Sequence, residues 1–377
     1  MKNLLVGNGI NIQFDKENYT TKSIVSRVLK NCDREDFPSH IIVDFPYLLK
    51  NYIGKLFLEA RNALQGKYDN FTNCESEKNS LNSFKEQYKE KLTSLTIMDI
   101  GFEDYYLIHD LVCHKTNTAN PEQYSVREAM RIAYLFSIYN DGKLNMLHTR
   151  YPDLLINYLK SFNSIFTTNY DSNIDSVVDV QVYHIHGWFE QLEAVYDAGS
   201  YRNHLPDAPI KNIQVDDEYF YLYSNALSTH CGAYKEFQLK QYALANDAVT
   251  KLANAYITNP TVKKDVDSWI DCENNITANM GCAVKAKVEN PDLTFEDNYH
   301  FDKLTTIVGE LEILGLSPWN DFHIFEAIDN SNIEKCVYYY FSEEQCNKVK
   351  SLLPNLFGKG LLEFLPVIKF WSVMNEK

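Results

Sequence analysis

No stretch of this 377-residue sequence approaches the roughly 18 consecutive apolar residues that a membrane-spanning helix needs. The apolar run Leu4-Leu5-Val6 is also too short for the hydrophobic core of a signal peptide. We therefore expect a cytoplasmic protein with no membrane partner.

Cysteine is scarce, and no two of the eight cysteines are close enough to form a CxxC pair. A structural zinc ribbon usually needs such pairs, so this class of metal site is not expected. A disulfide framework is not expected either, because it is typical of small secreted chains. We predict free and mostly buried thiols.

Basic residues are outnumbered, with 36 Lys and Arg against 51 Asp and Glu and a net charge of −15. An acidic chain repels phosphate backbones, so we expect no direct nucleic-acid partner. Hydrophobic residues make up 45% of the chain and aromatic residues 14%, which is ample for a packed core. Disordered and fibrous proteins are thereby excluded.

Short apolar segments alternate with stretches of helical periodicity. The strands are predicted near residues 4–6, 164–167, 180–186, 304–314 and 336–341. This alternation predicts an α/β fold, with a Rossmann-like parallel sheet covered by helices on both faces. We expect one domain over 1–377. A variable insertion at about 188–300 would include a strand-like segment at 219–223 and helices near 234–256 and 261–280.

The first of four polar segments that follow predicted strands is Gly7-Asn8-Gly9-Ile10-Asn11. Two glycines at this spacing allow a tight turn and a close approach of the backbone to a phosphate. A plain strand-to-helix turn is the alternative interpretation.

The second segment is Phe166-Thr167-Thr168-Asn169-Tyr170-Asp171. An amide and a carboxylate at the end of a strand can hold ribose hydroxyls or a water molecule. Considered alone, the segment is more simply explained by capping of the following helix by Asn169 or Asp171.

The third segment is His184-Ile185-His186-Gly187. On a strand both histidines would face the same side, but we identify no further ligands and predict no metal. His186, next to a glycine at a strand end, is well placed for a general base. A structural role is the simpler interpretation of His184.

The fourth segment is Gly315-Leu316-Ser317-Pro318-Trp319-Asn320-Asp321. Backbone amides and the Ser317 hydroxyl there could contact a dinucleotide. The alternative is an ordinary loop before a helix, capped by Ser317 or Asn320. In a parallel sheet, ligands bind outside the carboxyl ends of the strands, which is where all four segments fall.

The order of these segments resembles that of the SIR2-like superfamily, and more closely its bacterial members that act in phage defence. Abortive-infection AbiH-like proteins are similar in the opening G-N-G and in the HG pair. The likeness covers parts of 1–30, 160–190 and 305–345. It implies binding of NAD+ and cleavage of the bond between nicotinamide and ribose, with no metal.

The resemblance assigns roles to individual residues. Asn169 would orient the ribose or the attacking water, Asp171 would close the same motif, and His186 would be the catalytic histidine. The residues implied in dinucleotide binding are Gly7, Asn8, Gly9, Ile10, Asn11, Thr168, Gly315 and Ser317. Sirtuins also carry two CxxC pairs and a P-D-F-R continuation, whereas Ile12-Gln13-Phe14-Asp15 stands here.

These departures weigh against a protein deacylase and favour an NAD+ glycohydrolase that depletes NAD+ in abortive infection. A non-catalytic module that senses NAD+ or ADP-ribose and an NAD-dependent deacylase remain as alternatives. We expect a homo-oligomer, with a phage protein or another protein partner as its trigger.

Overall fold

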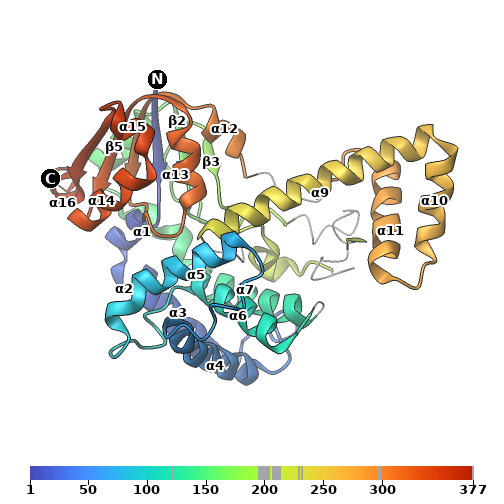
Figure 1. The fold of residues 1–377 in the computed structure, drawn as a ribbon. Helices are drawn as coiled ribbons and strands as arrows, with labels where there is room; N and C mark the ends of the chain where they lie inside the picture. The colour runs from blue at the N-terminus through green and yellow to red at the C-terminus, as the bar shows by residue number, and fades with distance from the viewer. Residues whose placement is uncertain are drawn as a thin grey trace.

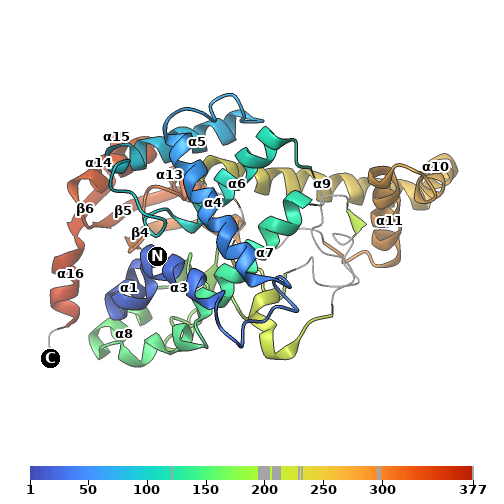
Figure 2. The same cartoon turned by 90° about the horizontal axis from the view of Figure 1, so that it is seen from below.

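Six strands form one sheet in the order β3-β2-β1-β4-β5-β6, and all neighbours are parallel. The computed structural model describes residues 1–119, 122–193, 204–205, 214–227, 230, 232–294 and 299–375 (Figures 1 and 2). The strands are β1 (Lys2–Val6), β2 (Ser164–Thr167), β3 (Val182–His184), β4 (Val308–Leu314), β5 (Asn332–Tyr340) and β6 (Leu362–Pro366). The order reverses between β1 and β4, which makes this the Rossmann arrangement with its switch point beside β1.

The carboxyl ends of three neighbouring strands lie level with one another. Val6 pairs with Thr167 of β2 on one side and with Leu314 of β4 on the other. The polar segments that follow these strands therefore emerge at a single edge of the sheet.

Hydrophobic side chains of the sheet alternate between two cores. Leu4 and Val6 of β1 pack in one core, whereas Leu5 between them packs in the other. Alternation of this kind places successive side chains on opposite faces. Because both faces are buried, the strand has to be apolar throughout, as its sequence is.

Helices cover both faces, as predicted. One face carries α1 (Gly9–Phe14), α8 (Asp153–Lys160) and α16 (Val367–Met374). The other face carries α12 (Phe301–Thr305), α13 (Phe322–Asp329), α14 (Glu343–Leu352) and α15 (Pro354–Gly358).

A large helical body lies between β1 and β2 in the sequence and below the sheet in Figure 1. Its helices are α2 (Lys16–Tyr19), α3 (Thr21–Asn31), α4 (Pro46–Leu64), α5 (Glu75–Tyr88), η1 (Lys89–Lys91), α6 (Phe102–Thr116), α7 (Glu122–Tyr139) and η2 (Lys143–Arg150). Most residues of α6 and of α7 are buried. The body continues the core of one sheet face and brings α6 toward the edge where the polar segments lie.

The predicted insertion contains a projecting arm. It is formed by α9 (Gly232–Thr258), α10 (Pro260–Ile270) and α11 (Asn275–Glu289), which share a small core of their own. In both views α10 and α11 lie at the far end of α9, away from the sheet. The near end of α9 packs on α5 and α13. Residues 194–203, 206–213, 228–229, 231 and 295–298 of the predicted insertion lie outside the described residues.

Two local predictions in this region are wrong. The single helix expected near 261–280 is interrupted, because α10 ends at Ile270 and α11 begins at Asn275. The tyrosine-rich segment expected as a strand is a 3-10 helix, η5 (Asp217–Tyr223). Its Tyr221 ring stacks on Tyr139 of α7 at 3.9 Å between centroids, so packing on α7 overrides the β propensity of the tyrosines. None of the described helices has both the length and the apolar character required to cross a bilayer.

Candidate functional site

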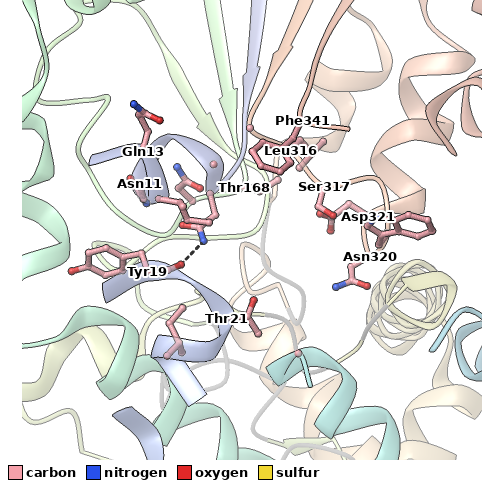
Figure 3. A pocket seen from close by; sticks show the side chains of 18 of the residues that line it. Asn11, Gln13, Tyr19, Thr21, Thr168, Leu316, Ser317, Asn320, Asp321 and Phe341 are labelled. Carbon is pink, nitrogen blue, oxygen red and sulfur yellow. Dashed lines mark hydrogen bonds between the residues drawn. The ribbon is translucent and has the colours of Figure 1, made fainter. Parts of the chain in front are cut away.

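The four polar segments meet around a cavity of about 1000 Å³ at the carboxyl edge of the sheet. In Figure 3, Asn11 and Thr168 lie on one side of it, and Ser317, Asn320 and Asp321 lie on the other. The helical body closes the cavity with residues that include Glu103 and Asp104. Its volume is at the upper end of the range of small-molecule sites, and it lies at the switch point of the sheet.

Glycines at the ends of β1 and β4 are packed backbone against backbone. A Cβ atom on Gly9 would come within 2.6 Å of the Gly315 Cα, and one on Gly7 within 2.5 Å of the Gly315 oxygen. Gly9 N donates a hydrogen bond of 2.9 Å to the same oxygen. The two turns approach each other so closely that side chains would not fit at Gly7, Gly9 or Gly315. Both turns thereby place their backbones at the cavity wall.

The two asparagines of the first segment have structural partners. Asn8 Nδ2 donates to the carbonyl oxygen of Tyr19 at 3.0 Å, which ties the turn to α2 (Figure 3). Asn11 Nδ2 donates to Asp171 Oδ2 at 2.7 Å, which joins the first segment to the second. Ile10 between them is fully buried in the core.

Asn169 places an uncommitted amide at the cavity. The residue is 5% exposed, and among the described residues its Nδ2 has no hydrogen-bond partner. Its backbone is fixed, since Asn169 N donates to Thr167 Oγ1 at 3.0 Å and its carbonyl oxygen lies 3.1 Å from His184 Nδ1. A rigid backbone carrying an unpaired buried amide is an arrangement suited to binding a ligand.

Asp171, by contrast, has its oxygens occupied. Oδ1 accepts hydrogen bonds from Asn173 N at 3.0 Å and Asn173 Nδ2 at 2.7 Å, and Oδ2 accepts one from Asn11. Although burial raises the pKa of Asp171, the donors from Asn11 and Asn173 oppose that effect. Asp171 lines the cavity, but its contacts are those of a residue that holds two turns together.

His184 and His186 point to different surroundings. His184 Nε2 lies 3.2 Å from Asp175 Oδ2, and the ring stacks on Trp188. The structural role predicted for His184 is therefore confirmed. Strand β3 ends at His184, so the two-residue alternation no longer places His186 on the same side.

His186 reaches the cavity beside two residues that follow β4. Its Nε2 lies 3.4 Å from His323 Nε2 and 3.5 Å from Asp321 Oδ1. Gly187, which follows, has a φ of +75°, and a Cβ there would come within 2.2 Å of the Asn225 carbonyl oxygen. The glycine of the HG pair is thus needed by the backbone turn itself.

A buried lysine at the base of the arm joins His186, Asp321 and His323, which we call the buried cluster. Lys235 on α9 is 1% exposed, and its Nζ lies 2.9 Å from Glu103 Oε1 and 3.6 Å from Asp321 Oδ1. Glu103 belongs to α6, so the lysine joins the arm, the helical body and the sheet edge. Sequence reasoning did not find Lys235 or Glu103, because neither lies in a segment that follows a predicted strand. It also missed His323, which lies two residues beyond the end of the fourth segment, inside α13.

Burial and Lys235 set the charges of the cluster. Burial lowers the pKa values of His186 and His323 well below the usual range, and the Lys235 ammonium lowers them further. Both imidazoles are therefore neutral near pH 7. Burial raises the pKa of Asp321 to about 6, against the opposing effect of Lys235, so this carboxyl is mainly ionised at neutral pH.

Most of the predicted site residues line the same cavity. The cavity is lined by Asn8, Gly9, Asn11, Thr168, Asn169, Asp171, His186, Gly315 and Ser317. Gly7 and Ile10 are not part of its lining, and they act through backbone packing and core burial.

No known protein family matches the chain, and comparisons with curated proteins and with solved structures find no similar protein.

Proposed function

We propose that the cavity binds NAD+ and that the protein hydrolyses its nicotinamide–ribose bond. The observation that carries the proposal is that an unpaired amide, Asn169, and a neutral imidazole, His186, line one large cavity at the switch point of a Rossmann sheet. Dinucleotides bind at this position in such sheets.

The two glycine turns fit the dinucleotide part of the substrate. The backbone after β1 and the Gly315-Leu316-Ser317 turn after β4 lie in contact at the cavity wall. A pyrophosphate can approach a backbone without side chains closely and can accept hydrogen bonds from its N–H groups. Ser317 is exposed at this wall and offers a hydroxyl to the adenosine half.

Asn169 and His186 fit the reacting end. Cleavage breaks the C1′–N1 bond, and the electron pair leaves with nicotinamide, which becomes neutral. A water oxygen forms the new bond to C1′ and releases a proton. In this proposal Asn169 orients the ribose or the water, and the His186 lone pair accepts the proton. Acid–base catalysis of this kind contributes about 10²–10⁴-fold.

The test is product formation by the purified chain. With NAD+ as the only substrate, we expect nicotinamide and ADP-ribose in equal amounts, resolved by liquid chromatography. Asn169→Ala and His186→Ala should remove most of the activity while circular dichroism remains unchanged. Matched controls are Asn82→Ala and His40→Ala, since both residues are exposed and neither lines the cavity.

The other outcomes separate the alternatives. Binding of NAD+ or ADP-ribose by calorimetry without turnover would favour a sensor module. Nicotinamide release that requires an acylated peptide would favour a deacylase. Wild-type rates in both cavity variants would refute the assignment of these residues.

In the cell we propose that the activity depletes NAD+ during phage infection, in a homo-oligomer released by a phage protein or another protein partner. The check is NAD+ content after infection of cells that carry the parent chain or the Asn169→Ala variant. The turnover assay is accordingly run across protein concentration and with infected-cell extract, so that an inactive resting form is detected.

A further inference from the structure

Three potential metal ligands converge beside the cavity. They are His186, which follows β3, and Asp321 and His323, which begin α13; their ligand atoms all lie within 4.8 Å of one another. His186 and His323 are both less than 8% exposed, and their rings are stacked at 5.5 Å between centroids. His186 and Asp321 line the cavity, so the cluster is open on one side.

Hydrogen bonding alone accounts poorly for this arrangement. The separations of 3.4 Å from His186 Nε2 to His323 Nε2 and 3.5 Å to Asp321 Oδ1 exceed the usual 2.7–3.2 Å of such bonds. The Nε2 atoms of His186 and His323 face each other. A hydrogen bond between them requires one Nε2 to carry a proton and the other to accept it. Within the described part of the chain, no donor lies within 3.5 Å of Asp321 Oδ1 in hydrogen-bonding geometry, and the Lys235 ammonium lies 3.6 Å from it.

The same separations match a tetrahedral metal centre. Ligand bonds of about 2.0–2.1 Å at tetrahedral angles put neighbouring ligand atoms about 3.3–3.4 Å apart. The His186–His323 and His186–Asp321 separations of 3.4 and 3.5 Å are close to this edge length. The third pair, Asp321 and His323, has ligand atoms within 4.8 Å of each other, so an ion bound by all three groups would draw this pair toward the same edge length.

The charges of the surroundings permit a dication. Lys235 is shared between Glu103 and Asp321, so two carboxyl groups face one ammonium group. The ammonium still competes with a metal for Asp321 Oδ1. His323 Nδ1 also has no partner in the described residues, whereas strong sites usually anchor that nitrogen.

We propose that His186, Asp321 and His323 form a site for one transition-metal dication of the zinc class, with a fourth ligand position facing the cavity. The competing ammonium and the unanchored His323 ring predict a modest affinity, on the order of micromolar, in place of the very tight binding of a structural zinc finger. The site would then fill and empty with the supply of metal.

Occupation of this site has a consequence that rests on the proposed function. A metal bound to His186 Nε2 occupies the lone pair that would otherwise accept a proton. We therefore expect Zn²⁺ to inhibit NAD+ hydrolysis by this chain, and a chelator to restore it.

The test titrates the full chain, after chelator treatment and dialysis, with Co²⁺ alone. We expect one Co²⁺ per chain with the intense visible absorption of tetrahedral coordination, and displacement by Zn²⁺. His323→Ala should weaken binding at least tenfold, and Asp321→Asn serves as a second variant if the first is misfolded. The controls are His40→Ala, an exposed histidine, and Cys272→Ala, an exposed thiol, which should bind as the parent does.

Failure to bind Co²⁺ or Zn²⁺, or binding that survives both His323→Ala and Asp321→Asn, would overturn the metal site. Binding is read without NAD+, so it is independent of turnover. A chain that binds metal at this cluster but never releases nicotinamide refutes the proposed function alone. A chain that hydrolyses NAD+ without binding metal refutes the metal site alone.

Discussion

The side-chain amide of Asn11 donates a 2.7 Å hydrogen bond to Asp171 Oδ2, although 160 residues separate them. Both side chains are buried, and the bond joins the helix after β1 to the turn after β2. The carboxylate therefore fixes the position of the segment that carries Asn169.

Exchange of these two residues tests that role. Asp171→Asn places a second amide donor opposite Asn11 or displaces the Asn173 bonds, so we expect a loss of about 1–3 kcal/mol in the free energy of unfolding. Asn11→Asp places two carboxylates in contact and should cost at least as much. The double variant Asn11→Asp with Asp171→Asn restores a donor–acceptor pair. We expect it to be more stable than the sum of the single changes predicts, as measured by urea unfolding.

The close contact of the two turns gives a second prediction. In Gly9→Ala the new methyl group would lie 2.6 Å from the Gly315 Cα. The atom in contact belongs to the backbone, so it cannot move aside as the end of a flexible side chain would. We expect a loss of about 1–3 kcal/mol in stability and weaker NAD+ binding by calorimetry.

The matched control is Gly54→Ala, in the interior of α4, where a Cβ meets no atom within 4 Å. Alanine should stabilise that helix by up to about 1 kcal/mol. Equal stability of the Gly9 and Gly54 variants would contradict the importance of the glycine contact.

Lys235 provides a third prediction. Lys235→Met removes the ammonium between Glu103 and Asp321 and leaves two carboxyl groups facing each other. Loss of one partner of a buried ion pair typically costs about 3–5 kcal/mol. We expect a loss of that order in denaturant unfolding, with faster hydrogen exchange at the near end of α9.

Lys240→Met on the same helix is the control. Lys240 is 66% exposed and pairs with Glu236 four residues earlier, so its loss should be small. If the two lysine variants unfold alike, the buried cluster does not anchor the arm.

Asp104 gives a prediction about pH. It is 3% exposed, Tyr88 donates a hydrogen bond of 2.8 Å to it, and burial raises its pKa to about 7. The folded chain thus keeps a proton that the unfolded chain releases near pH 4. The resulting stability is fully present below about pH 4 and is lost as the pH rises to about 7.

Asp104→Asn removes this titration. We expect the variant to exceed the parent in stability by more at pH 8 than at pH 5, with a change in the difference on the order of 2–3 kcal/mol. The measurement is urea unfolding at both pH values. A difference that does not vary with pH would show that Asp104 is ionised throughout this range.

Sequence patterns predicted the central strands because a strand buried on both faces appears in the sequence as a short run of apolar residues. β2 has the expected bounds, Ser164–Thr167, since an apolar run there ends in polar residues. β6 was missed because it is an edge strand of intermediate burial and lacks a strong apolar run. Ser125 and Glu128 match the S-x-x-E pattern of a helix start, but they lie inside α7, where Glu128 forms a buried ion pair with Arg131.

Some residues of the candidate site could be predicted from local sequence patterns, and others could not. The segments after β1, β2, β3 and β4 could be predicted to meet, because parallel strands present their carboxyl ends at one edge. Lys235 and Glu103 come from helices whose docking depends on contacts far along the chain. No local pattern distinguishes such a buried lysine from the many that lie on the surface.

The pairing of β1 with β4 also constrains when the cavity can exist. Asn3 Nδ2 donates to the carbonyl oxygen of Glu310, a residue 307 positions later. During synthesis the first strand has to wait for that distant partner. The cavity lining also includes residues from Gly315 to Asn375, so a ribosome-bound nascent chain lacks a finished pocket until nearly all of its length has been translated.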